Sequence, residues 1–277
     1  MEANQPSRTA EGAAALRAVH QILDQPPVFE DPLAIRILGA DDGPLDAVLD
    51  RYDTAEMRPL RASIAVRSRY AEDALAAAVA RGVRQYVLLG AGLDTFAYRN
   101  PHAGERLHVF EVDHPATQAW KRARLQRVGI PIPDLLTFVP IDFERETLPA
   151  ALGRSGFDAG APAFFSWLGV TVYLTREAVL DTLRFVATLA PGSEIAFTYV
   201  ARPSSGHTRS ALGARAQALG EPWQTFFDPS ALERDLRGLG FREVEDVAPS
   251  EANLRYLDDR ADQLRVGTFG HLMRAQV

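Results

Sequence analysis

The sequence predicts an α/β fold in which a doubly wound sheet follows a helical amino-terminal region. From residue 85 onward, short apolar runs rich in β-branched and aromatic residues alternate with helical stretches. Residues 1–80 instead favour helices, because Leu16, Val19 and Leu23 share one helical face and residues 63–80 are rich in Ala without Gly or Pro. Continuous apolar strands between helices are typical of a sheet that is buried on both faces.

The apolar runs define seven expected strands and the stretches around them three expected helices. The strands are expected at 85–90, 107–113, 135–142, 162–170, 193–200, 241–247 and 265–275, and the helices at 115–128, 175–189 and 229–239. The last two strands have a short connection and are expected to form an antiparallel edge. We divide the chain into a helical cap, residues 1–80, and a core, residues 81–277, with an insertion at 201–226.

Composition excludes several classes of function. The net charge of −6 over 277 residues argues against a nucleic-acid partner, because phosphate neutralisation dominates such binding. No apolar run is long enough for a membrane span, and the amino terminus lacks a secretory signal pattern, so we expect a cytoplasmic protein without a membrane partner. Cys is absent, which removes disulfides, thiolate nucleophiles and Cys-ligated zinc, and no metal site is expected.

A glycine turn follows the first strand in QYVLLGAGLDTFAYR, residues 85–99. In open α/β sheets, ligands bind at the carboxyl ends of the strands, and Gly90-Ala91-Gly92 lets a ligand approach the backbone there. A dinucleotide fingerprint would have a third glycine where this chain has Thr95, and Asp94 near the helix start disfavours a pyrophosphate. A ligand with a positive or zwitterionic end fits this turn better.

Two acids at the next strand ends point to a nucleoside. Asp113 lies about twenty residues beyond the glycines, where an acid can accept both hydroxyl groups of a ribose. Asp142 and Phe143 offer a carboxylate and an aromatic face, which suit an adenine. Taken singly, the glycines can be an ordinary turn, Asp113 a helix cap and Asp142 a strand end. Taken in order, they predict an adenosyl ligand without phosphates, of which S-adenosylmethionine is the common one.

Several motifs together resemble a known family. SRTAEGAAALRA, RSRYAEDAL, YVLLGAGLDTFAYR, VFEVDHPATQAWKRARL, FVPIDFE and WLGVTVYLT occur in this order between about residues 7 and 190. They are similar to motifs of the bacterial relatives of leucine carboxyl methyltransferase, within the class I S-adenosylmethionine-dependent methyltransferases. The resemblance implies a Rossmann-like, doubly wound, seven-stranded methyltransferase sheet with an amino-terminal helical cap, and a cofactor at the carboxyl ends of the first four strands.

The resemblance also implies roles for individual residues. The arginine that binds the cofactor carboxylate matches Arg67, and the glycine-loop contact matches Gly90, with Ala91 and Gly92 beside it. The ribose acid matches Asp113, and the adenine contacts match Asp142 and Phe143. Many relatives have Glu-Gly where this chain has Leu168-Gly169, so the cofactor ammonium is expected to contact backbone carbonyls or Asp94. Arg69, two residues beyond Arg67, is the alternative for the clamp; without the resemblance, both arginines are more often solvated helix charges.

The chemistry favours a carboxylate as the methyl acceptor. A carboxylate has a pKa of about 4 and is ionised at neutral pH, whereas a phenol would need deprotonation that costs roughly 4 kcal/mol. No convincing general base is visible, since His207 is a lone histidine in a loop. The acceptor pocket is expected between the cap and the 201–226 insertion, with His207 and Trp223 as candidate substrate contacts; Arg202 and Phe226 lie nearby.

The expected function is therefore O-methylation of a small-molecule carboxylate, with S-adenosylmethionine as cofactor. A phenol or alcohol acceptor is the first alternative, and a non-catalytic ligand-binding relative is the second. Thr95 and the solitary Lys121 argue against a nicotinamide-dependent oxidoreductase, which would need a third glycine and a Tyr-Lys pair or its equivalent.

Overall fold

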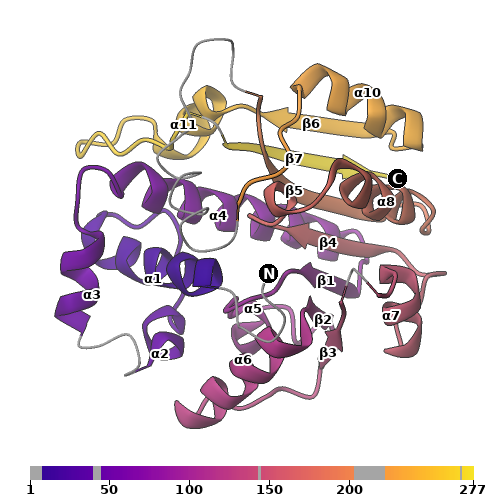
Figure 1. Cartoon of the computed structure of the whole chain (residues 1–277), viewed down its shortest axis with the longest axis horizontal. Coiled ribbons are helices and arrows are strands. Elements are labelled where there is room, and N and C mark those ends of the chain that lie inside the picture. The colour runs from indigo at the N-terminus through magenta and orange to yellow at the C-terminus, as the bar shows by residue number, and fades with distance from the viewer. Residues whose placement is uncertain (1–7, 40–44, 143–144, 203–221, 269) are drawn as a thin grey trace.

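The centre of the molecule is a mixed seven-stranded sheet. Its strands are β1 (Gln85–Leu89), β2 (His108–Asp113), β3 (Leu136–Pro140), β4 (Ala163–Trp167), β5 (Glu194–Val200), β6 (Glu243–Val247) and β7 (Gly270–Gln276). Their spatial order is β3-β2-β1-β4-β5-β7-β6, as the computed structural model in Figure 1 shows. The model describes residues 8–39, 45–142, 145–202, 222–268 and 270–277. The predicted fold class is confirmed.

The order of the strands places a crevice at the end of β1. Strand β1 pairs in parallel with β2 on one side and with β4 on the other. The chain therefore changes direction across the sheet at β1, and such a switch point leaves a crevice at the carboxyl ends of the strands. Strand β7 runs antiparallel to both β5 and β6. The predicted antiparallel edge is confirmed, with β6 as the outer strand.

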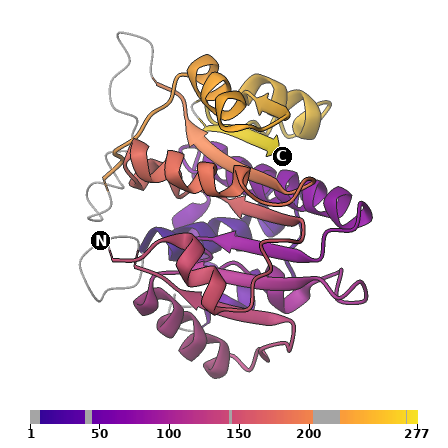
Figure 2. The ribbon, with the colours of Figure 1, turned by 90° about the vertical axis from the view of Figure 1, so that its right-hand side faces the viewer.

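Helices cover both faces of the sheet because the strands are apolar on both faces. They are α1 (Arg8–Leu23), α2 (Ala34–Leu38), α3 (Leu45–Tyr52), α4 (Arg58–Ala80), α5 (Phe96–Arg99), α6 (Pro115–Arg127), α7 (Leu148–Arg154), α8 (Arg176–Ala187), α10 (Pro229–Leu239) and α11 (Pro249–Leu257). Helices α7, α8 and α10 pack against one face, and α4, α5 and α11 pack against the other. Figure 2 shows the side that carries α8 and α10.

Helix α4 links the amino-terminal helices to the sheet. Tyr70 and Leu75 of α4 pack in the same cluster as Tyr86 and Phe164 of the sheet. Ile64, on another face of α4, packs with α1, α2 and α3 in a separate cluster. Helix α4 therefore contributes to both layers, and the division of the chain at residue 80 stays a prediction.

Three local features differ from the sequence-based expectations. The connection before β7 contains helix α11, which the sequence pattern did not indicate. Strand β7 begins only at Gly270, so residues 265–268 of the expected strand 265–275 are a loop. Strand β4 ends at Trp167, because Gly169 has a φ of +75° that no regular strand continues. Among the helices of the described residues, we find none with the length and apolar character that a bilayer span requires.

Candidate active site

A cavity of about 860 Å³ lies at the carboxyl ends of the central strands. Its wall contains most of the residues that the sequence predicted for the cofactor and the substrate: Arg67, Gly90, Ala91, Gly92, Asp113, Asp142 and Trp223. Phe143 and His207, the other two predicted residues, lie outside the described residues. The volume falls in the upper part of the range of about 300–1,000 Å³ that is usual for small-molecule sites.

The glycine turn after β1 requires both of its glycines. The backbone N–H groups of Gly90 and Ala91 donate to the carbonyl of Val112, at 2.8 and 3.1 Å, which holds the turn against β2. Gly90 and Gly92 have φ values of +67° and +46°. A Cβ atom on Gly90 would lie 2.5 Å from Cγ2 of Val170, and one on Gly92 would lie 3.0 Å from Cβ of Ala10. Substitution of Gly92 would therefore disturb the packing of α1 as well as any ligand.

Asp113 ties the end of β2 to the glycine turn. Its Oδ2 accepts a hydrogen bond from the backbone N–H of Gly92 at 2.6 Å, and its Oδ1 accepts one from His114 at 2.7 Å. Burial raises the pKa of Asp113 although these N–H groups oppose the effect. The cap of α6 is His114, whose side chain accepts from the N–H of Ala116, so the interpretation of Asp113 as the helix cap is wrong. Its carboxylate instead lies in the wall of the cavity.

Arg67 and Arg69 have different surroundings. Arg69 is about half exposed and pairs with Asp73 at 2.8 Å on the surface of α4. Arg67 lines the cavity, and Gly169 is the residue that makes room for it, since a Cβ atom there would collide with the guanidinium. Burial and the nearby Arg17 lower the pKa of Arg67 to about 10, so it stays charged at neutral pH. Within the described part of the chain, no hydrogen bond satisfies this guanidinium.

Asp94 supplies a negative charge to the same cavity wall. One of its oxygens, Oδ1, accepts from the backbone N–H of Phe96 at 2.7 Å. Asp94 also attracts Arg67, whose pKa it raises. An anion and a cation that lie on one wall are complementary to a zwitterion, such as the α-amino acid end of a ligand. Asp142 lines the cavity as well and pairs with Arg145 at 3.3 Å.

A buried ion pair holds helix α1 over the glycine turn. Nε of Arg17 lies 2.7 Å from Oδ2 of Asp31, and its NH2 group donates to the carbonyl of Leu93 at 2.8 Å. Thr95 donates to the same Asp31 oxygen at 2.5 Å. Burial alone would raise the pKa of Asp31, but Arg17 and Arg99 lower it below its usual value. The sequence motif around Arg17 was recognised, but this contact with the turn was not expected.

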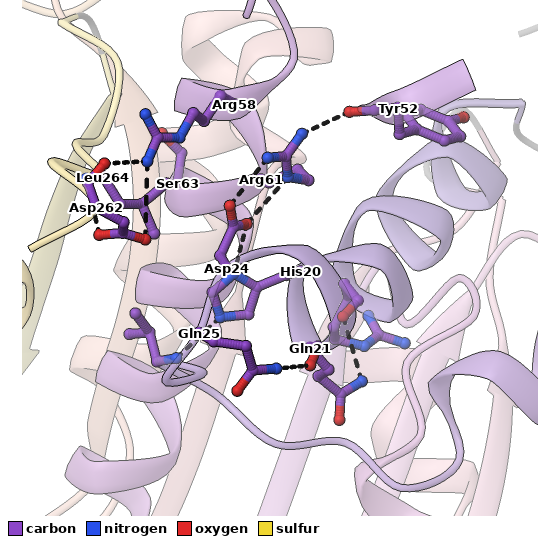
Figure 3. Close-up of polar contacts among 12 residues, drawn as sticks. His20, Gln21, Asp24, Gln25, Tyr52, Arg58, Arg61, Ser63, Asp262 and Leu264 are labelled. Carbon is purple, nitrogen blue, oxygen red and sulfur yellow. Dashed lines mark hydrogen bonds and ion pairs between the residues drawn. The ribbon is translucent and has the colours of Figure 1, made fainter. Parts of the chain in front are cut away.

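A second buried network joins helices α1, α3 and α4 (Figure 3). Asp24 lies between His20, whose Nδ1 is 3.0 Å from Oδ2, and Arg61, which contacts both carboxylate oxygens at 2.9 Å. Arg61 also donates to the carbonyl of Tyr52 at 2.5 Å, so α3 is anchored to α4. Burial acts to raise the pKa of Asp24, but His20 and Arg61 outweigh it and lower the pKa to about 2.

Strands β5, β6 and β7 carry a polar cluster beside the cavity that was not predicted from the sequence. Tyr199 donates to Oδ1 of Asp246 at 3.0 Å, and Nδ1 of His271 lies 3.1 Å from the same carboxylate. Tyr199 and His271 are register partners and line the cavity. These three residues come together because β7 lies antiparallel between β5 and β6. Their spacing along the sequence does not indicate this arrangement.

Comparisons with known proteins show the class to which this chain belongs. The chain is 30% identical to "Putative S-adenosyl-L-methionine-dependent methyltransferase YktD" of Bacillus subtilis strain 168, over 99% of both chains. It is 35% identical to a Mycobacterium marinum protein of the same description, over 94% of this chain and 82% of that one. The fold matches the crystal structure of a "putative methyltransferase" from Thermobifida fusca YX, with a TM-score of 0.61, 18% identity, and coverage of 99% and 96%. The class is therefore that of the S-adenosylmethionine-dependent methyltransferases, with S-adenosylmethionine as cofactor.

The family can be stated as well. The model of the leucine carboxyl methyltransferase family matches residues 10–187, which is more than half of the chain. The chain belongs to this family, which confirms the resemblance seen in its motifs and the predicted enzyme class. The matched region begins in α1 and ends in α8, so it includes the glycine turn and Asp113 but not β5, β6 and β7.

The low pKa of Asp24 predicts how stability depends on pH. Because the pKa is about 2 in the folded protein and 3.8 when unperturbed, the charge stabilises the fold fully above about pH 4. This contribution, about 2 kcal/mol, is lost as the pH falls toward 2. Asp24→Asn should lower the free energy of unfolding by about 3–5 kcal/mol at pH 7, and by less at pH 2.

Urea unfolding at several pH values measures this difference. Asp53→Asn is the control, since Asp53 is exposed and this change should have little effect at any pH. A deficit of the Asp24 variant that is the same at pH 2 and pH 7 would contradict the assigned role of the carboxylate.

Proposed function

We propose that the protein methylates a carboxylate oxygen of a small molecule and forms a methyl ester. The observation that carries this proposal is the indole Nε1 of Trp223, which is buried and has no hydrogen-bond partner among the described residues. A buried donor without a partner costs about 1–3 kcal/mol, so the structure favours a ligand that brings an acceptor. An ionised carboxylate only accepts hydrogen bonds, whereas an indole N–H only donates them. The description of the family also supports this class of acceptor.

The lining residues at the ends of β1, β2 and β3, together with Arg67, suit the cofactor. We propose that Arg67 binds its carboxylate and that Asp94 or backbone carbonyls bind its ammonium group. The turn at Gly90, Ala91 and Gly92 allows close approach to the backbone, and Asp113 accepts from the ribose hydroxyl groups. Asp142 and Phe143 are proposed to contact the adenine. Bound there, S-adenosylmethionine supplies an electrophilic methyl group on a sulfonium sulfur, and the chain's task is to place the acceptor beside it and exclude water.

A second candidate is O-methylation of a phenol or an alcohol, which the pair of Asp246 and His271 favours. The Asp246 carboxylate only accepts, so a neutral His271 carries its proton on Nδ1 and keeps a lone pair on Nε2. Such an imidazole is a suitable general base for a hydroxyl acceptor. A carboxylate acceptor needs no base, so the two candidates predict different roles for His271.

The cofactor assignments predict a contrast between two neighbouring arginines. Arg67→Ala and Asp113→Ala should each remove charge-assisted hydrogen bonds worth about 1.5–3 kcal/mol. The affinity for S-adenosylhomocysteine, measured by calorimetric titration, should fall roughly ten- to a hundredfold. Arg69→Ala is the matched control and should change it little, because Arg69 pairs with Asp73 outside the cavity. A larger loss with Arg69→Ala would contradict the assignment of the clamp.

The acceptor class predicts the nature of the product. With a carboxylate acceptor, labelled methyl groups should be released as methanol by mild alkali, and kcat should be constant from about pH 6 to pH 9. His271→Gln should then lower kcat only slightly. A hydroxyl acceptor would instead give an alkali-stable ether, a rate that rises with pH, and a loss of about 10²–10⁴-fold in the same variant.

Trp223 can be tested without loss of its ring. Trp223→Phe keeps an aromatic side chain but removes the N–H donor, so the KM for the acceptor should rise roughly tenfold while kcat changes little. Trp120→Phe is the control, since Trp120 packs under Arg124 on α6 and does not line the cavity. Initial rates with a labelled methyl group report both constants. An unchanged KM in the Trp223 variant would remove the observation on which the carboxylate proposal rests.

A further inference from the structure

Part of the cavity wall is apolar and comes from α3, α4 and the segment after β4; we call this part of the cavity the apolar compartment. Six apolar side chains line this compartment: Val48, Tyr52, Met57, Leu60, Ile64 and Leu174. Four of them are only 3–7% exposed, namely Val48, Tyr52, Met57 and Ile64. They belong to the apolar cluster that packs with α1 and α2, so each presents only a small part of its surface to the cavity, and that part is apolar and shielded from bulk water.

The compartment continues directly from the Arg67 clamp along α4. Leu60, Ile64 and Arg67 are spaced i, i+4 and i+7, so they share one face of this helix. With a rise of 1.5 Å per residue, Leu60 lies about 10 Å from Arg67 along the helix axis. This length is enough for a chain of several carbon atoms or for an aromatic ring.

The acidic residues of the cavity lie away from this compartment. The acids among the described lining residues are Glu11, Asp94, Asp113 and Asp142, and they come from α1 and from the ends of β1, β2 and β3. None of them comes from α3, from α4 or from residues 171–174. The charged lining residues of these elements are Arg51, on the exposed side of α3, and Arg67 of α4.

The compartment is held open by contacts that do not involve a ligand. Arg61 of α4 bonds to the carbonyl of Tyr52 and to Asp24, as Figure 3 shows. Ser63, which also lines the cavity, accepts from the backbone N–H of Gly267 at 3.1 Å and so ties the loop before β7 to α4. A preformed apolar space needs little reorganisation to bind an apolar group.

We propose that the acceptor carries an apolar body, alkyl or aromatic, that lies between α3 and α4 while its reacting group faces the cofactor. The inference rests on the proposed function for the identity of the reacting group, a single carboxylate. The inference that the acceptor has an apolar body does not depend on that proposal, because it rests on the apolar residues that line the compartment. Short acids and dicarboxylic acids fit this arrangement poorly, because they leave the apolar walls uncovered or bury a second charge.

A series of straight-chain acids from acetate to decanoate, together with phenylacetate and succinate, tests the proposal. Transfer of labelled methyl groups should give a kcat/KM that rises about fourfold for each added methylene, equivalent to about 0.8 kcal/mol, until the compartment is full. Affinity for the protein loaded with S-adenosylhomocysteine, measured by calorimetry, should rise in parallel. A flat series, or a preference for succinate, would overturn the inference.

Two variants locate the apolar body. Ile64→Trp should fill the compartment and shift the optimum to shorter acids, and Leu60→Ala should remove apolar contact and weaken the dependence on chain length. Ile35→Trp on α2 is the control, since Ile35 is 42% exposed and outside the cavity, and it should leave the series unchanged. If Ile64→Trp fails to fold, Leu60→Ala carries the test. A dependence on chain length that survives both changes would place the apolar body elsewhere.

The two readouts separate this inference from the proposed function. If affinity rises with chain length but no acid is methylated, the carboxylate proposal fails and the apolar body stands. If esters form without any dependence on chain length, the carboxylate proposal stands and the compartment is not the acceptor site.

Discussion

The carboxylate of Asp113 is the contact on which the rest of the site depends. By accepting the N–H of Gly92, it joins the ends of two adjacent strands and fixes the turn between them. The turn can take this path only with positive φ values at Gly90 and Gly92, and these glycines then allow Val170 and Ala10 to approach closely. Together with the bonds of Gly90 and Ala91 to Val112, this hydrogen bond fixes the turn against which the segment after β4 and helix α1 pack, and so contributes to the shape of the cavity.

The walls of the cavity contain buried charges, and their pairing decides which charge is left for a ligand. Arg17 is neutralised by Asp31, and Arg61 by Asp24, so both can act as structural contacts between helices. Arg67 has no such partner in the described part of the chain, and the nearby Arg17 opposes its charge. An anionic group that binds Arg67 relieves this repulsion, because a buried cation gains more from pairing than an exposed one.

Features that depend on local sequence were predicted well, whereas features that depend on distant contacts were not. The strand ends at residues 89 and 113 follow from apolar runs and the glycines, and the sequence placed them to within one residue, at 90 and 113. Helix α11 was missed because its apolar residues do not form a clear helical stripe: Ala252 and Leu257 are buried, but Leu254 between them is 67% exposed. The choice between Arg67 and Arg69 depends on which face of α4 meets the cavity, and this is set by packing. The cluster of His271 and Asp246 required the register of β7.

The two candidate acceptors differ in what they leave unsatisfied inside the protein. Tyr199, Asp246 and Nδ1 of His271 already satisfy one another by hydrogen bonds, so this cluster is stable without a substrate. The indole N–H of Trp223 is a buried donor that no described residue satisfies. A satisfied network can be purely structural, whereas an unsatisfied donor has a free-energy cost that only a bound acceptor removes. These observations favour a ligand that brings a hydrogen-bond acceptor, and among such ligands we prefer the carboxylate because it is ionised at neutral pH and needs no general base.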